Sequence, residues 1–261
     1  MINKDITVII PLHEVNETTN DLYSNAVKSI TNQLVKPTKV LIVTPKDSEA
    51  NTFANNFDYG DIKDLVSVIE NDGDTDFSSQ MNFAVNKCET KWFSLLEFDD
   101  EYSSIWFKNV HEHIEAHGDI QLFLPMIVDV DTDGVFIGFT NEAVWANSFS
   151  DELGVLDKES LLAYQQFNID GMVMDKETYL NLGGLKKNMK LTFIYEFLLR
   201  MTFNSIRVMT IPKLGYKHLN QRPGSLFNQY KQTIDPVEAN WWLNKAKNEY
   251  YHTTDRELSY Q

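Results

Sequence analysis

Four carboxylic acids lie directly after the apolar run 92–96: Glu97, Asp99, Asp100 and Glu101. Like charges repel, so acids gathered at the end of a buried strand are costly unless a cation or solvent occupies the space between them. The spacing therefore indicates a candidate metal and phosphate site. The alternative for the same residues is a solvated acidic loop.

Strand-like and helix-like segments alternate on the N-terminal side of these acids. Short apolar runs that stop at proline or at polar turns predict buried strands over residues 6–10, 39–44, 65–69 and 92–96. Apolar residues at helical spacing predict helices over 22–34 and 77–86, while residues 46–64 indicate a weak helix or a loop. This alternation is typical of an open, mostly parallel sheet with helices on both faces, which binds ligands outside the carboxyl ends of its strands. We therefore expect the acids at the ligand-binding edge of an α/β fold.

The pattern is less regular on the C-terminal side. It predicts a helix over 106–114, a strand over 122–130, a possible hairpin at Asp133 and Gly134, and a possible helix over 159–164. It then predicts helices over 176–182 and 192–204, a last strand over 206–211 that stops at Pro212, and a terminal helix that starts at Pro236. No internal repeat or flexible linker marks a boundary, so we expect one compact body.

The composition disfavours several classes of protein. Of the 261 residues 43% are hydrophobic, yet no apolar run approaches the roughly 18 residues that a membrane helix needs. The formal charge of −15 repels nucleic acid, and the sequence has no basic stripe. Cys88 is the single cysteine and the N-terminus lacks the regions of a secretory signal, so we expect a cytoplasmic protein without a membrane span.

Several short motifs follow one another along the chain in a recognisable order. The early motifs are Ile6-Thr-Val-Ile-Ile-Pro11, Asn71-Asp-Gly73, Gln80-Met-Asn82 and Glu97-Phe-Asp99-Asp100-Glu101. The later ones are Gly171-Met-Val-Met, Tyr179-Leu-Asn-Leu-Gly183-Gly184, Glu196-Phe-Leu-Leu-Arg200, Ile211-Pro212 and Arg222-Pro-Gly-Ser225. From about residue 6 to 227 their order and spacing resemble family 2 glycosyltransferases of the GT-A fold, which move a sugar from a nucleotide diphosphate donor to an acceptor hydroxyl.

The resemblance implies a fold, a donor site and a metal. The implied fold is α/β of the GT-A type, with a Rossmann-like, mostly parallel central sheet and an acceptor-side C-terminal extension. Residues 1–101 would form the nucleotide-sugar-binding half, and residues 102–261 the acceptor-binding half with a helical tail. The residues implied in donor binding are Pro11, Asn71, Gln80, Asn82, Glu97, Phe98, Asp99 and Arg222; those implied in holding Mn²⁺ or Mg²⁺ are Glu97, Asp99 and His218. The implied activity is a metal-dependent, inverting transfer to a glycan or another hydroxyl acceptor.

Two parts of the chain depart from the family pattern. Thr44 stands where members carry an acid that contacts the nucleotide base, and Phe193 and Ile194 stand where they carry an acid pair that includes the general base. Glu196 is the nearest acid and is our first candidate base. An ion pair with Arg200, one helical turn later, explains the same residue equally well.

Asp170, just before Gly171, is the second candidate base, with an ordinary loop acid as the alternative. If no base is present, the chain is a catalytically degenerate GT-A-like module that acts as a binding or assembly protein. Trp145, Trp241 and Trp242 could stack on a sugar, although packing in a core or an interface is the commoner use of a tryptophan.

Overall fold

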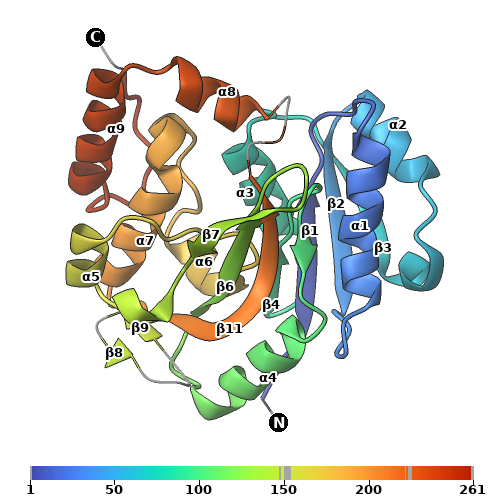
Figure 1. Ribbon diagram of the computed structural model, residues 1–261, viewed down its shortest axis with the longest axis horizontal. Coiled ribbons are helices and arrows are strands. Elements are labelled where there is room, and N and C mark those ends of the chain that lie inside the picture. Colours follow the sequence, from blue (N-terminus) through green and yellow to red (C-terminus); the bar gives the residue numbers. More distant parts are fainter. Residues whose placement is uncertain (1, 147, 150–153, 221, 223–224, 260–261) are drawn as a thin grey trace.

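The computed structural model describes residues 2–146, 148–149, 154–220, 222 and 225–259 and has an α/β architecture built on one curved sheet (Figure 1). Along the sheet the described strands follow the order β3-β2-β1-β4-β10-β6-β11-β9-β8, with β5 paired to β11 and β7 paired to β6. Strands β1, β2, β3 and β4 run parallel, as do β6 and β11. The predicted GT-A type α/β fold with a mostly parallel core is confirmed.

The N-terminal half follows the predicted alternation closely. Its elements are β1 (Ile6–Pro11), α1 (Thr19–Thr31), β2 (Lys39–Pro45), α2 (Glu49–Asn56), the 3₁₀ helix η1 (Gly60–Leu65), β3 (Val66–Asn71), α3 (Phe77–Lys87) and β4 (Trp92–Leu95). The chain leaves β1 for β2 and β3 on one side and returns to place β4 on the other side. Between β1 and β4 lies the switch point at which open α/β sheets form a ligand crevice.

The C-terminal half adds antiparallel strand pairs, of which the sequence pattern indicated only the hairpin at Asp133 and Gly134. Its elements are β5 (Glu101–Tyr102), α4 (Trp106–Ala116), β6 (Leu122–Val130), β7 (Phe136–Thr140), η2 (Ala143–Trp145), β8 (Ser148–Phe149), β9 (Gly154–Leu156), α5 (Lys158–Ala163), β10 (Val173–Asp175), α6 (Lys176–Asn181), η3 (Lys187–Thr192), α7 (Phe193–Phe203), β11 (Val208–Leu219), α8 (Leu226–Thr233) and α9 (Pro236–Glu249). The predicted hairpin at Asp133 and Gly134 joins β6 to β7. Strand β10 is short and antiparallel to both of its neighbours, β4 and β6.

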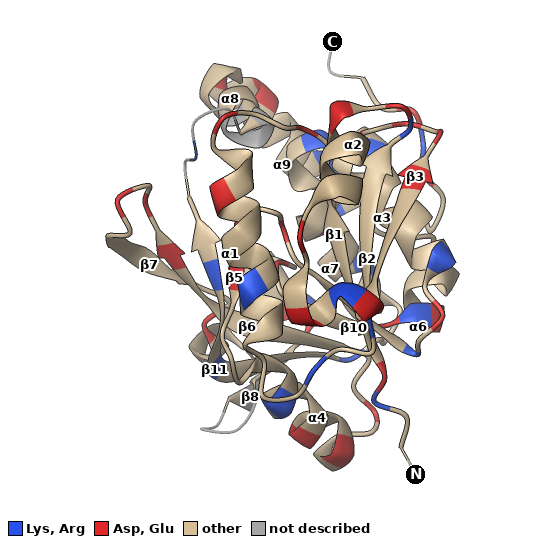
Figure 2. Ribbon diagram, turned by 90° about the vertical axis from the view of Figure 1, so that its right-hand side faces the viewer, with Lys and Arg blue, Asp and Glu red and all other residues tan. Residues whose placement is uncertain are grey.

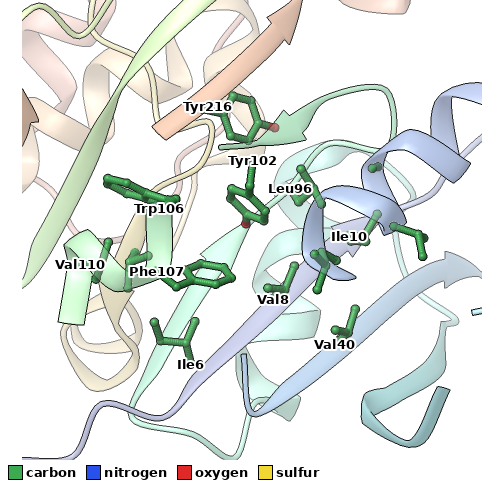
Figure 3. Packing of buried hydrophobic residues seen from close by; sticks show 14 of the residues in the cluster. Ile6, Val8, Ile10, Val40, Leu96, Tyr102, Trp106, Phe107, Val110 and Tyr216 are labelled. Atoms are coloured by element: carbon green, nitrogen blue, oxygen red, sulfur yellow. The ribbon is translucent and has the colours of Figure 1, made fainter. Parts of the chain in front are cut away.

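Two hydrophobic layers hold the helices against the two faces of the sheet. In β1, Ile6, Val8 and Ile10 belong to the layer under α1 and α4, whereas Ile9 belongs to the layer under α3 and α7. Figure 3 shows part of the first layer, in which β1 side chains and Leu96, directly after β4, lie close to α4 residues and the ring of Tyr216. Burial of both faces explains why the strands appear in the sequence as continuous apolar runs.

The prediction that the last strand stops at Pro212 is wrong. Strand β11 continues to Leu219, and its pairing with β6 skips residues between Ile211 and Leu214 and again between Leu214 and Tyr216. Proline cannot donate to the strand ladder, and a bulge accommodates it without ending the strand. The extra length carries Tyr216 and His218 to the edge where β1 and β4 end.

The surface carries both signs of charge, with acids in excess. Figure 2 shows lysines and arginines scattered over the face in view instead of gathered in one stripe. Within the described part of the chain, no helix combines the length and the hydrophobicity needed to cross a membrane.

Candidate active site at the carboxyl ends of the strands

Three segments that are distant in sequence meet beyond the ends of β1 and β4. Leu12 follows β1 and donates its backbone N–H to Val43 of β2 at 2.9 Å. Leu96 follows β4 and donates to the carbonyl of Ile9 at 3.0 Å, and the next N–H, of Glu97, donates to the hydroxyl of Tyr216 at 3.0 Å. These bonds hold the acids after β4 next to the C-terminal end of β1 and the C-terminal part of β11.

A compact group of ligand atoms lies at this junction. Asp100, Asp170 and His218 each offer one atom, and these atoms lie within 4.8 Å of one another. The Nδ1 of His218 is 3.1 Å from Oδ2 of Asp100 and 3.9 Å from Oδ2 of Asp170. The backbone N–H of Leu219 donates to the other oxygen of Asp100 at 2.8 Å. Both aspartates are buried, whereas His218 is partly exposed.

The electrostatics of this group indicate a shortage of positive charge. Burial, followed by the charges of Asp170, Asp100 and Asp99, raises the pKa of Glu97 well above its usual value. Burial raises the pKa of Asp170 to about 7, although His218 and a hydrogen bond to Glu97 oppose the rise. Burial alone would lower the pKa of His218, but Asp100, Asp170 and Glu97 raise it well above normal. The raised pKa values favour the protonated forms of these three groups, and a bound cation would compete with those protons.

The chemistry of these residues fits a divalent cation. Carboxylate oxygens with one imidazole nitrogen form a ligand set that suits Mn²⁺, and Mg²⁺ accepts the oxygens. Burial and, after it, the charges of neighbouring carboxylates raise the pKa values of Glu97 and Asp170. A bound divalent cation would relieve that repulsion.

Asp99 has a different partner from the other acids. Its Oδ2 accepts a hydrogen bond from Nε of Arg222 at 2.5 Å, and Nη2 of the same arginine donates to Oε1 of Glu14 at 2.9 Å. The guanidinium carbon lies 4.9 Å from the centre of the Phe98 ring. Arg222 therefore ties the segment after β1 to the segment after β4, across the switch point of the sheet.

The position of Asp170 depends on the glycine that follows it. Gly171 has φ +72°, and a Cβ there would lie 2.5 Å from the ring of Tyr216. Its N–H donates to Leu95 at 3.1 Å, and its carbonyl accepts from the indole of Trp106 at 2.9 Å. Only glycine fits this backbone, and these bonds fix the preceding carboxylate beside β4.

The other residues implied in donor binding are distributed around the same edge. Pro11 is buried at the end of β1, and Asn71 closes β3, where it accepts from Gly73 at 3.0 Å and donates to Asp74 at 2.8 Å. Gln80 is buried in α3, and its Nε2 has no hydrogen-bond partner among the described residues. Thr44 is buried, and its hydroxyl accepts a hydrogen bond from the amide of Asn51.

Asn82 has structural partners in the same region. Its Oδ1 accepts from the Tyr179 hydroxyl at 2.6 Å and from the Leu185 N–H at 2.9 Å. Its Nδ2 donates to the Leu185 carbonyl at 2.8 Å. These bonds join α3 to the turn after α6, so this amide is already engaged within the protein.

Glu196 lies in a closed ion-pair cluster. Arg200 donates to its two carboxylate oxygens at 3.0 and 2.9 Å, and Nζ of Lys186 lies 2.8 Å from Oε1. All three side chains are almost completely buried. The ion pair between Glu196 and Arg200 is confirmed. The role of Glu196 as general base stays a prediction, and the two cations at its carboxylate favour the ion-pair alternative.

The family resemblance implied for Asp100 only a part behind the metal ligands or a contact to the ribose, and it gave Tyr216 no part. The metal was assigned to the E-x-D spacing of Glu97 and Asp99, whereas the structure places Asp100 in the cluster. Tyr216 and His218 are two residues apart and therefore share one face of a strand. That signal was hidden by the assumption that the strand ended at Pro212.

Comparison with solved structures supports the fold. Staphylococcus aureus TarS, residues 1–349 in complex with UDP-GlcNAc, is 13% identical with a TM-score of 0.68 over 94% of this chain and 66% of that chain. The same TarS fragment with UDP is 12% identical with a TM-score of 0.61, covering 95% of this chain and 80% of that chain. A longer TarS structure is 14% identical with a TM-score of 0.59, and this chain spans 43% of it.

Comparison with sequences gives the family. No curated protein matches this chain. The model of glycosyl transferase family 2 matches residues 7–161, which is more than half of the chain and includes β1 to β4 and the acids that follow β4. On this match, the chain belongs to glycosyl transferase family 2.

Proposed function

We propose that the protein is a metal-dependent, inverting glycosyltransferase that moves a sugar from a nucleotide diphosphate donor to a glycan or another hydroxyl acceptor. One observation carries the proposal: a buried cluster of Asp100, Asp170 and His218, short of positive charge, lies at the switch point of a family 2 sheet. Similar structures contain UDP-GlcNAc or UDP, so a uridine diphosphate sugar is the first donor to test.

The two halves of the chain would divide the work. Residues 1–101 would bind the donor through the ends of β1, β3 and β4, and residues 102–261 would bind the acceptor. Asp100 comes from the first half, while Asp170 and His218 come from the second. The cluster thus lies where donor and acceptor would meet.

Asp100 and His218 would hold Mn²⁺ or Mg²⁺, with Glu97 and Asp99 beside them. Such cations commonly use one or two protein ligands together with phosphate oxygens, and when bound the ion supplies charge neutralisation for the departing nucleotide diphosphate. Arg222, which now pairs with Asp99 and Glu14, would contribute a second positive group near the diphosphate.

Asp170 would be the general base. Its Oδ2 lies 3.9 Å from Nδ1 of His218, next to the proposed cation site, where a carboxylate could accept the proton of an acceptor hydroxyl. Asn168 donates a hydrogen bond to Oδ2 of Asp170 and orients the carboxylate. The acceptor proton would pass to Asp170 as the hydroxyl attacks the anomeric carbon from the side opposite the nucleotide.

The test is turnover with a panel of nucleotide sugars, beginning with UDP-GlcNAc, in the presence of Mn²⁺ or Mg²⁺. We expect hydrolysis or transfer that a chelator abolishes, and we expect Asp100→Asn to remove both activity and calorimetric binding of UDP with Mn²⁺. Glu101→Gln is the matched control, because Glu101 is partly exposed and pairs with Lys217 on the surface. No turnover with any donor of the panel would contradict the proposal.

A degenerate module is the second candidate. Phe193 and Ile194 lie at the start of α7, where the family pattern has a pair of acids that includes the general base. Glu196 is held in ion pairs with Arg200 and Lys186. Tight binding of UDP with Mn²⁺ but no turnover of any sugar nucleotide would favour this candidate.

For either candidate we place the protein in the cytoplasm, since its single Cys88 is a free, buried thiol.

A further inference from the structure

Two aromatic rings stack face to face near the end of the sheet opposite α1 and α2. Trp145 ends η2 and Tyr164 directly follows α5, and their ring centres are 4.4 Å apart with planes inclined by 13°. Trp145 is 47% exposed. In Figure 1 α5 and β9 lie on the left, and α1 and α2 lie on the right. An exposed stacked pair of this kind is neither core nor an isolated surface ring.

The chain segments that carry the two rings are hydrogen-bonded to each other next to Asp170 of the candidate active site. Asn141 and Asn168 form a reciprocal pair: the amide of Asn141 donates to the Asn168 carbonyl at 2.8 Å, and the Asn168 N–H donates to Oδ1 of Asn141 at 2.7 Å. The side chain of Asn168 in turn donates to Asp170. The segment from Tyr164 to Asp170 can span at most about 20 Å.

Polar groups border the apolar faces of the two rings. Oε2 of Glu142 accepts from the indole N–H of Trp145 at 3.4 Å, and the Tyr164 hydroxyl donates to the Gln166 amide oxygen at 3.3 Å. Burial and, after it, the charge of Glu142 raise the pKa of Tyr164. The stack places Tyr164 behind Trp145 and leaves Trp145 47% exposed. An exposed aromatic face with a carboxylate at its rim and an amide nearby suits a pyranose ring, whose C–H groups pack on the ring and whose hydroxyls donate to the rim.

We propose that Trp145 and Tyr164 bind a neutral pyranose unit of a glycan acceptor, and that this platform presents the acceptor end to Asp170. This inference rests on the proposed glycosyltransferase function and adds the chemical class of the acceptor. The carboxylate of Glu142 disfavours acidic sugars and polyphosphate acceptors because of charge repulsion. The reciprocal Asn141–Asn168 pair sets the distance between the platform and the base.

The test of the platform is the binding of neutral tetrasaccharides of glucose and of N-acetylglucosamine to the full chain. Calorimetry and saturation-transfer NMR measure this binding. We expect one of the two tetrasaccharides to bind, and Trp145→Ala to weaken it by about tenfold, with partial recovery in Trp145→Phe. Trp241→Ala on α9 is the control and should bind as the wild type does. Hydrolysis of the donor without acceptor should be the same in all three variants.

Several outcomes would overturn the platform. Binding of neither tetrasaccharide to the wild type, or equal binding to Trp145→Ala, removes it. A dimer that dissociates in Trp145→Ala assigns the face to a second copy of the chain, because Phe136, Ile137 and Phe139 of nearby β7 are also exposed. If no donor is turned over while tetrasaccharide binding still depends on Trp145, the catalytic proposal fails and the platform stands.

Discussion

The molecule contains two buried groups of charged side chains that differ in how their charges are balanced. In the cluster of Lys186, Glu196 and Arg200, both oxygens of the glutamate contact cations, and Arg200 also donates to the carbonyls of Leu182 and Gly184. In the cluster of Asp100, Asp170 and His218, carboxylates outnumber the cation. We call the first cluster balanced because its two cations, which outnumber its one carboxylate, also donate to backbone carbonyls, including Lys186 to that of Glu249. A buried cluster with such pairing is a structural unit, whereas an excess of carboxylates leaves a place for a cation.

The largest expected effect is on catalysis at the unbalanced cluster. Asp170→Asn keeps the size of the side chain but removes the proton acceptor, so transfer should fall by roughly 10²- to 10⁴-fold. Binding of UDP with Mn²⁺, measured by calorimetry, should stay close to that of the wild type. Loss of nucleotide binding in this variant would instead make Asp170 a metal ligand and leave the base unassigned.

The balanced cluster should respond in stability. Glu196→Gln leaves Lys186 and Arg200 buried without a counter-charge and should cost about 3–5 kcal/mol of unfolding free energy, read from urea denaturation. Donor hydrolysis per folded molecule should be unchanged. The triple replacement of Lys186, Glu196 and Arg200 by apolar residues should cost less than the single change. An inactive but stable Glu196→Gln would contradict the comparison and restore Glu196 as the base.

The pH dependence of stability, measured without any ligand, should report the excess of carboxylates in the cluster of Asp100, Asp170 and His218. A carboxyl whose folded pKa is raised destabilises the fold as it ionises, so the contribution of Asp170 is lost as pH rises from about 4 towards 7, by at most about 4 kcal/mol. His218, whose folded pKa is also raised, loses its contribution as pH rises above about 6.5. In Asp170→Asn the thermal midpoint should fall less steeply with rising pH than it does in the wild type. An identical slope in the wild type and in Asp170→Asn would contradict an excess of carboxylates in this cluster.

The smallest expected effect is that of the cation on thermal stability. An ion that binds only the folded protein adds about 2.7 kcal/mol at a concentration one hundred times its Kd. Mn²⁺ should therefore raise the thermal midpoint of the wild type and of Glu196→Gln by similar amounts, and should leave Asp100→Asn unchanged. A shift that survives in Asp100→Asn would place the ion elsewhere.

The regular part of the fold was predictable because its strands are buried on both faces. The apolar runs of β1, β2 and β4 and the helical spacing of α3 are direct consequences of that burial. Strand β10 was missed because three residues between a turn and a helix carry too little periodicity to indicate a strand. The α9 helix was predicted from Pro236, and Asp235 caps it with bonds to two backbone N–H groups.

The site was less predictable than the fold because its members come from distant segments. His218 was included among the expected metal ligands, but Asp100 and Asp170, with which it clusters, were assigned other parts or none. Sequence does not indicate which of the four acids after β4 points inward, nor whether Glu196 faces a substrate or Lys186. Charge pairing across more than a hundred residues is fixed by topology, which short motifs do not encode.

The irregular pairing of β11 has a consequence for how its length can vary in related proteins. From Ile211 to Tyr216 the chain advances five residues while β6 advances only from Pro125 to Ile127, so three residues are extra, an odd number. An odd count exchanges the two faces of the strand that follows. Deletion of one residue in this stretch would therefore turn Gly215 and Lys217 towards the cluster and Tyr216 and His218 away from it. A library of length variants should lose donor turnover for changes of one residue and regain part of it for changes of two.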